Sequence, residues 1–235
     1  MKYKVLFIIS FIVNLCLILF CIFLIVNPFV VKTPNEIFKK SIDSIVEVKA
    51  SKDYVGESYG SGVVYSKDGD IITNAHILTY RANGENKFFD NLEIRFHDDS
   101  EYLSAELVKV DIEKDLALLK YETSNNMRSI CVSDSTYSYG DLVYAIGNTS
   151  NYGIGISQGI ISVPEVNIVF EGLSHVMIQA DINIASGNSG GALLDSDGKL
   201  IGITTFRTKD LNGNVNYGFV YSIPIKIILN FVRRV

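Results

Sequence analysis

Gly187-Asn188-Ser189-Gly190-Gly191-Ala192-Leu193 is the most informative stretch of the chain. A serine that is flanked by glycines and followed by an apolar strand can present its oxygen on a tight turn. The bare backbone also lets the N–H groups of Gly187 and Ser189 converge on one point, which is the geometry of an oxyanion hole. Because glycines surround serines in plain hairpin turns as well, the stretch indicates catalysis only together with a base and an acid elsewhere in the chain.

Three histidines are candidates for the base: His76, His97 and His175. His76 follows the apolar run Ile71–Thr73, where a small helical turn can hold its ring in a cleft. His97 and His175 lie in alternating strand patterns, which predict surface or half-buried side chains. The sequence therefore favours His76.

The acid that orients the base is predicted to be Asp115, which directly precedes an apolar strand. A carboxylate in that position can be buried and still reach an imidazole. Asp98 and Asp99 lie in a polar turn, and Asp111 lies in the charged turn before Asp115. We expect those three to be solvated loop charges.

Short runs rich in Val, Ile, Tyr and Phe recur along the chain and are separated by Gly, Asn, Asp and Ser. Two Asp-Gly turns, in Lys67–Asp70 and Ser196–Lys199, lie between such runs and predict hairpins. About a dozen strands at this spacing predict an all-β domain built from sandwiches or barrels. The predicted strands are Ile45–Val48, Gly62–Tyr65, Ile71–Thr73, Leu92–Phe96, Leu103–Val110, Leu116–Tyr121, Leu142–Ile146, Ile156–Val163, His175–Gln179, Ala192–Leu194, Leu200–Phe206 and Asn216–Ser222.

Helices are expected only near the two ends of this domain. Thr33-Pro34-Asn35-Glu36 has the spacing of a capping box with proline at the first helical position, which predicts a short helix through about Ser41. After Pro224 a mostly apolar segment predicts a C-terminal helix over about residues 224–234 that packs on the domain.

The N-terminal region is apolar enough to cross a membrane. Residues 5–26 are 22 residues without a charge, and at about 1.5 Å each they span about 33 Å, the thickness of a bilayer's hydrocarbon core. No small-residue cleavage site follows Val26, so we expect an uncleaved signal-anchor helix, with a cleaved signal peptide as the alternative. Basic residues are nearly balanced on the two sides. The short N-terminus predicts residues 1–4 in the cytoplasm, with 27–43 as linker and short helix.

Charge and cysteine content exclude several classes of protein. The chain has 21 Lys+Arg against 26 Asp+Glu and a net charge of −5, which argues against nucleic-acid binding. Cys16 and Cys21 lie in the apolar segment, and Cys131, which has no partner, is expected to be a small buried hydrophobe. Neither a His-Glu-x-x-His motif nor a cluster of Cys and His occurs, so neither a metal nor a cofactor is expected.

Several segments carry a resemblance to a known family. They are Gly60–Val64, Thr73–His76, Asp115–Leu119, Ala145–Asn148, Gln158–Ser162, the stretch from Ile178 to Gly191, and Ser222–Ile225. Jointly they resemble trypsin-like serine peptidases of the HtrA/Deg type, here without the usual C-terminal PDZ domain. The resemblance covers most of residues 45–235. It implies a chymotrypsin/trypsin-like domain over 44–235 with two six-stranded β-barrels, at about 44–122 and 138–222, and the site between them.

The resemblance also implies roles for individual residues. Ser189 is the expected nucleophile, His76 the general base and then acid, and Asp115 the residue that holds the imidazole tautomer. The oxyanion hole is expected from Gly187, Asn188 and Ser189. The substrate-binding residues implied are Asn183, Ile184, Thr204, Thr205, Phe206 and Arg207.

None of these substrate-binding residues is acidic. We therefore expect cleavage after small or medium apolar residues such as Val, Ala or Leu, from an extended substrate that pairs as a strand with Thr205–Arg207.

Two departures from the family bear on activation. Asn188 stands where digestive relatives have an aspartate that pairs with a newly freed N-terminus, so activation by N-terminal cleavage is not expected. Ala185-Ser186 replaces an Asn-Pro pair, which removes a rigid φ angle and leaves room for an inactive resting state of the oxyanion-hole loop.

The sequence thus predicts a membrane-anchored serine endopeptidase with its catalytic domain outside the cytoplasm, acting on unfolded or exposed polypeptide segments. A catalytically silent peptide-binding or sensor module on the same fold is the alternative. An enzyme that stays off until a peptide, a partner or oligomerisation orders Gly187 is a third possibility. Assembly as a homotrimer, as in many relatives, stays open.

Overall fold

The computed structural model divides the chain into two units, Met1–Lys32 and Thr33–Val235. The described residues are 2–26, 32–123, 127–149, 152–170, 173–206 and 219–233. The first unit contains helix α1, Lys2–Val26. Its residues Lys2–Phe23 are long and apolar enough to cross a membrane, by length and composition. The predicted apolar N-terminal helix is therefore present.

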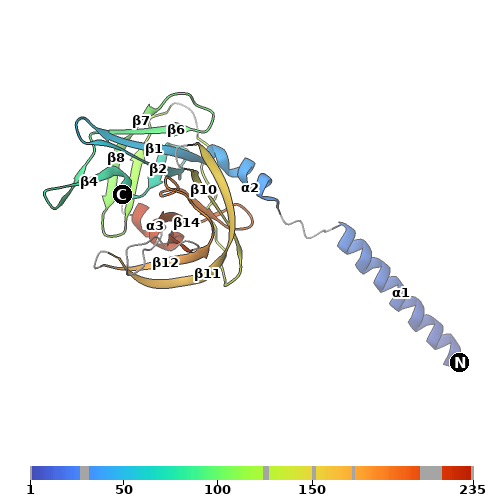
Figure 1. Ribbon diagram of the computed structural model, residues 1–235. Coiled ribbons are helices and arrows are strands. Elements are labelled where there is room, and N and C mark those ends of the chain that lie inside the picture. Colours follow the sequence, from blue (N-terminus) through green and yellow to red (C-terminus); the bar gives the residue numbers. More distant parts are fainter. Residues whose placement is uncertain are drawn as a thin grey trace. The chain divides into compact units, whose positions relative to one another are not determined.

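The first half of the second unit is a β-sheet with strand order β7-β6-β1-β2-β3-β9-β8 (Figure 1, blue to green). Only Ala105 separates β7 from β8, so the two edges of this sheet are consecutive parts of one bent strand, and the sheet closes on itself as a barrel. The strands are β1 Ile45–Lys52, β2 Gly56–Val64, β3 Asp70–Thr73, β6 Asn91–Phe96, β7 Leu103–Ser104, β8 Glu106–Asp111 and β9 Leu116–Lys120.

The second half is a closed barrel with strand order β10-β11-β12-β15-β14-β13 (Figure 1, yellow to red). The long pair β11 and β12 contains two register shifts, between Ile161 and Val163 and between Val163 and Val166. Such bulges bend a strand and increase its twist. The strands are β10 Leu142–Asn148, β11 Ile154–Phe170, β12 Leu173–Asp181, β13 Ala192–Leu194, β14 Leu200–Phe206 and β15 Phe219–Pro224.

The predicted all-β class with paired trypsin-like barrels is confirmed. Both Asp-Gly turns close hairpins, β2–β3 and β13–β14, with Gly69 at φ +95° and Gly198 at φ +73°. Helix α2, Pro34–Ser41, begins with the predicted capping box on Thr33. Helix α3, Ile225–Val232, follows Pro224.

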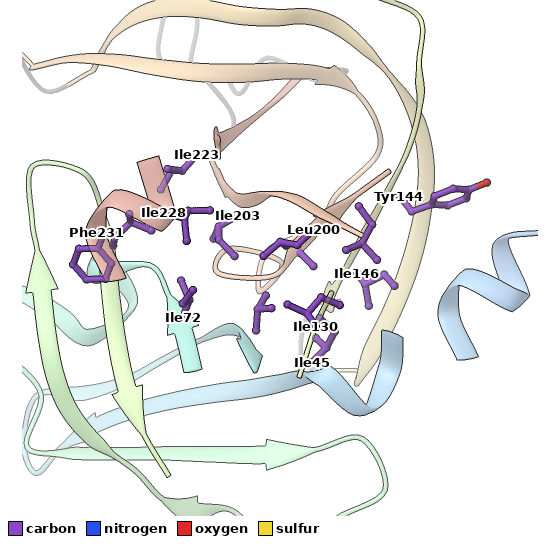
Figure 2. Close-up of a cluster of buried hydrophobic side chains, with 14 of the residues drawn as sticks. Ile45, Ile72, Ile130, Tyr144, Ile146, Leu200, Ile203, Ile223, Ile228 and Phe231 are labelled. Atoms are coloured by element: carbon purple, nitrogen blue, oxygen red, sulfur yellow. The ribbon is translucent and has the colours of Figure 1, made fainter. Parts of the chain in front are cut away.

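Each barrel has its own apolar core, and a third cluster lies between the barrels. Figure 2 shows members of this third cluster from both halves of the chain, with Ile45 and Ile72 from the first barrel and Ile146 and Ile203 from the second. Ile228 and Phe231 of α3 pack into the same cluster. The shared core fixes the two barrels against each other, so side chains from both can meet at one site.

Two sequence predictions need comment. The predicted burial of Cys131 is wrong, because its side chain is exposed. Its neighbour Ile130 is buried, and the backbone carbonyl of Cys131 accepts the N–H of Leu200 at 2.7 Å. In such an extended segment adjacent side chains point to opposite sides, which turns Cys131 outward. Part of the predicted strand Asn216–Ser222 lies outside the described residues, and β15 begins at Phe219.

Candidate active site

His76 lies on a short 3₁₀ helix, Ala75–Leu78, that directly follows β3. Its neighbours Ala75, Ile77 and Leu78 are buried, which anchors the turn to the first barrel. The His76 side chain is 49% exposed. The predicted helical turn is thus present. It is anchored by its buried residues and holds the His76 imidazole at the surface.

Asp115 binds His76 at two points. Its Oδ1 accepts the backbone N–H of His76 at 2.9 Å, and its Oδ2 lies 2.8 Å from the ring Nδ1. An ionised carboxylate is an acceptor only, so Nδ1 carries the proton. The other ring nitrogen, Nε2, is then free to act as a base.

The backbone of Asp115 is in the left-handed region, with φ +53°. The side-chain amide of Asn74 holds this conformation by donating to the Asp115 carbonyl at 2.8 Å. Non-glycine residues with positive φ are uncommon and cluster at functional sites. The sequence block that carries His76 therefore also fixes the residue that orients it.

Thr205 on β14 completes the hydrogen bonds of the acid. Its hydroxyl donates to Asp115 Oδ2 at 2.6 Å. Thr205 belongs to the second barrel and Asp115 to the first, so this bond joins the two barrels at the site. The resemblance assigned Thr205 only to substrate binding, and no local pattern shows that its hydroxyl reaches a residue 90 positions away.

Ser189 lies in a loop in which Gly190 and Gly191 have no room for side chains. Gly190 has φ +83°, and a Cβ on it would lie 2.1 Å from the carbonyl oxygen of Ser61. Its N–H donates to the Thr204 carbonyl at 2.8 Å, while the N–H of Gly191 donates to Asn188 at 3.0 Å. The chain can make this close turn only with glycine at these positions.

The same loop carries two backbone N–H groups with no acceptor among the described residues, those of Gly187 and Ser189. The third predicted member, Asn188, uses its N–H to bind the Ala185 carbonyl at 3.3 Å. The Asn188 carbonyl accepts the N–H of Gly191 and the hydroxyl of Thr204, at 2.6 Å from the latter. Fixing this carbonyl also fixes the direction of the Ser189 N–H, since both belong to one planar peptide.

The Ser189 hydroxyl donates to the backbone carbonyl of Thr205 at 2.5 Å. Within the described part of the chain, no hydrogen bond joins this hydroxyl to His76. The structure therefore brings Ser189, His76 and Asp115 to one site, with the Ser189 side chain turned toward β14.

The predicted substrate-binding residues differ in their surroundings. Asn183 is exposed, and Ile184 is buried in the core of the second barrel. Thr204 is buried, and its hydroxyl donates to the carbonyl of Asn188, the residue before Ser189. Phe206 ends β14, but its side chain is not described, and Arg207 lies outside the described residues.

The competing residues have other partners. His97 packs edge-on against Phe38, with ring centroids 6.0 Å apart. Asp98 is 96% exposed, as predicted for a loop charge. Asp111 pairs with Lys114, which lowers the pKa of Asp111 despite its partial burial.

His175 on β12 does reach the site region. It lines a cavity of about 380 Å³ beside His76. The two histidines share this cavity with apolar side chains from three segments. Its lining includes Tyr80, Ile112, Leu173 and Met177.

Comparisons with known proteins identify this arrangement. Residues 60–203 match the family model described as a trypsin-like peptidase domain. The serine endoprotease DegS of Haemophilus influenzae is 34% identical over 213 residues, which are 90% of this chain and 58% of the relative. The periplasmic pH-dependent serine endoprotease DegQ of Escherichia coli is 32% identical over 191 residues, 80% of this chain and 39% of the relative.

Among solved structures, the HtrA-type protease AlgW with tripeptide has a TM-score of 0.74 and 29% identity, over 86% of this chain and 63% of that chain. The chain belongs to the trypsin-like serine peptidases, and its relatives are of the HtrA/Deg type. It spans less than two-thirds of the length of these relatives. The family recognised from the sequence motifs is confirmed.

Proposed function

We propose that this protein is a membrane-anchored serine endopeptidase in which Ser189 attacks the peptide bond, His76 transfers the proton and Asp115 orients His76. One observation carries the proposal above all others. The Asp115 carboxylate binds both the backbone N–H and the ring Nδ1 of His76. That arrangement leaves one imidazole nitrogen as a base beside a serine on a glycine-rich turn.

Acylation begins when the Ser189 hydroxyl turns from the Thr205 carbonyl toward His76. As Oγ attacks the substrate carbonyl carbon, its proton passes to His76 Nε2. The carbonyl oxygen becomes an oxyanion and accepts the N–H groups of Gly187 and Ser189, which have no other acceptor among the described residues. The tetrahedral intermediate collapses when His76 gives the proton to the leaving amine and the C–N bond breaks.

Deacylation repeats the steps with water. His76 takes a proton from a water molecule as the water oxygen attacks the acyl carbon. His76 then returns the proton to Ser189 Oγ. The ester bond breaks and a carboxylic acid is released. Removal of one oxyanion-hole donor typically costs 10²–10³-fold in rate, about 2.7–4 kcal/mol. The two free N–H groups are therefore a large part of the proposed rate enhancement.

The proposed substrate is an extended polypeptide segment with a small or medium apolar residue before the scissile bond. The segment proposed to pair with a substrate strand is Thr205–Arg207, of which Thr205 and Phe206 are the last residues of β14. Asn183 and Ile184 contribute no charge that would hold Arg or Lys. Sequencing the products from a mixed peptide library would test this preference, and a majority of cleavages after Arg or Lys would contradict it.

We propose that α1 anchors the enzyme with its catalytic domain outside the cytoplasm. The length and apolar composition of Lys2–Phe23 support a span, and the name of the relative DegQ places that protein in the periplasm. N-terminal sequencing of the mature protein distinguishes an uncleaved anchor from a cleaved signal peptide. An N-terminus at or near Met1 is expected, whereas one beyond Val26 would mean a cleaved signal peptide.

The reaction class is tested by labelling the detergent-solubilised full chain with a fluorophosphonate and locating the adduct by mass spectrometry. This probe reacts with a serine that its base and oxyanion hole have activated. Modification of Ser189 alone, absent in Ser189→Ala, is the expected result. A folded chain that stays unlabelled would favour the silent module, unless added peptides restore labelling, which would indicate a switched enzyme.

A further inference from the structure

Ser61 on β2 is fully buried, and all of its polar atoms are engaged. Its hydroxyl donates to the Gly187 carbonyl at 2.7 Å and accepts the backbone N–H of Asn148 at 2.7 Å. Its own N–H donates to the Ser189 carbonyl at 2.8 Å, and its carbonyl accepts the Thr73 hydroxyl at 2.6 Å. Two of these four bonds hold the loop that carries the nucleophile.

Gly187 requires such a restraint. It has φ +94°, and glycine has more backbone freedom than any other residue. Rotation about its two backbone bonds changes the direction of its N–H group. The Ser61 hydroxyl holds the peptide that follows Gly187, and the bond from Asn188 N–H to the Ala185 carbonyl closes the turn. Both bonds act on the peptide that joins Gly187 to Asn188, so at the observed φ of Gly187 they fix the neighbouring plane relative to which its N–H is directed.

Asn148 and Glu47 in turn fix the Ser61 hydroxyl. Glu47 is 4% exposed, and its Oε2 accepts three donors. They are Arg95 Nη2 at 2.9 Å, the Tyr102 hydroxyl at 3.0 Å and Asn148 Nδ2 at 3.2 Å. Because the Asn148 N–H points at Ser61 Oγ, the hydroxyl proton of Ser61 is left for the loop. Burial and the Glu47 carboxylate raise the pKa of Tyr102 above its ordinary value, so Tyr102 remains a donor.

From this geometry we propose that Ser61 is a positioning residue of the oxyanion hole, and that its hydroxyl keeps the Gly187 N–H directed at the developing oxyanion. The proposal rests on the proposed peptidase function. Close packing supports it, since a Cβ on Gly147 would lie 2.7 Å from Ser61 Oγ. The first barrel thereby sets the geometry of a loop that belongs to the second barrel.

Labelling kinetics of the detergent-solubilised full chain test the proposal. For Ser61→Ala we expect the maximal rate of fluorophosphonate attachment to Ser189 to fall about 10–100-fold, less than when an oxyanion-hole donor is removed outright. The probe concentration that gives half the maximal rate stays unchanged. The matched control is Ser58→Ala, on the same strand and half-buried, which leaves both constants unchanged. Partial unfolding would lower the labelled fraction instead of the rate constant.

Hydrogen exchange supplies a readout that does not depend on catalysis. Ser61→Ala should speed exchange of the amides in residues 183–191 and leave the barrel strands protected. If the wild-type chain is not labelled even with added peptides, the proposed function fails, and exchange alone decides whether Ser61 holds the loop. Should Ser61→Ala not fold, Ser61→Cys, which keeps a weak donor, replaces it. An unchanged labelling rate together with unchanged exchange overturns the proposal.

Discussion

Asp115 combines backbone strain with the central contact of the site. Its left-handed backbone costs about 1–2 kcal/mol. Hydrogen bonds from Asn74 and His76 offset this cost. In the resulting conformation Oδ1 accepts the backbone N–H of His76, and Oδ2 lies within hydrogen-bond distance of His76 Nδ1 and the Thr205 hydroxyl.

Asp115→Asn should lower kcat by about four orders of magnitude, because an amide can donate to Nδ1 and so favours the wrong imidazole tautomer. The comparison is made on a peptide substrate with the full chain in detergent. Asp98→Asn, an exposed acid in a surface turn, is the matched control and should retain wild-type kcat. A variant at Asp115 that kept wild-type kcat would remove this residue from the mechanism.

Thr205→Val should lower kcat by about 10–100-fold, since a hydrogen bond to a charged group is worth about 1.5–3 kcal/mol. Valine keeps the shape of threonine and loses only the hydroxyl that binds Asp115. Thr136→Val, at an exposed position, serves as control. Equal losses in both variants would show that the Thr205 hydroxyl has no specific effect on catalysis.

Local sequence was informative about the residues that carry chemistry and silent about those that support them. His76 follows a recognisable strand, and Ser189 lies in a glycine-rich turn that precedes one. Ser61 lay within a motif and Thr205 was among the predicted substrate-binding residues, but the partners of both hydroxyls lie far along the chain, in the other barrel. Long-range hydrogen bonds of this kind depend on how the barrels pack, which no local pattern encodes.

At the scale of elements, turn chemistry was the best guide. The two Asp-Gly turns were predicted from sequence, whereas the hairpin of β4, Thr79–Ala82, and β5, Glu85–Phe88, was not. Its signal was available in Asn83-Gly84, where both residues have positive φ, as a two-residue hairpin requires. The flanking residues are mostly polar and exposed, so the hydrophobic alternation that marked the other strands is missing.

Two glycines with the same φ angle allow the cost of backbone strain to be compared with the cost of a steric clash. Gly84 and Gly190 both have φ +83°, but a Cβ on Gly84 meets nothing within 4 Å. Gly84→Ala should therefore cost only about 1–2 kcal/mol, which lowers the melting temperature by about 2–8 °C for a domain of this size.

Gly190→Ala should lower the melting temperature considerably more and abolish labelling of Ser189, because its Cβ would lie 2.1 Å from the Ser61 carbonyl oxygen. Circular dichroism of the full chain in detergent measures both variants. Equal shifts would mean that the loop around Gly190 relaxes freely, contrary to the packing described.

At the scale of the whole molecule, the core shared by the two barrels explains why the site exists. Ile72 lies one residue before Thr73 on the way to His76, and Ile203 lies shortly before Thr205. Burial of these residues in one cluster brings β3 and β14 together (Figure 2). The spacing of short apolar runs predicted many strands, but only the resemblance to a family supplied the pairing of barrels.

The proposed orientation can be read from Cys131. Its exposed thiol should react with a membrane-impermeant maleimide on intact spheroplasts, while Cys16 and Cys21, within α1, should not. Cys131→Ser provides the control, and mass spectrometry locates the adduct. Labelling that appears only after lysis would place the domain on the cytoplasmic side.

The central claim is that His76 and Ser189 act as one catalytic unit. Its most direct test is the rate at which the detergent-solubilised full chain hydrolyses unfolded, fluorescein-labelled casein. Ser189→Ala, His76→Ala and the double variant should each lose about the same factor, on the order of 10⁶, because members of one unit are not additive. Clear hydrolysis by Ser189→Ala, or losses that multiply in the double variant, would contradict the account.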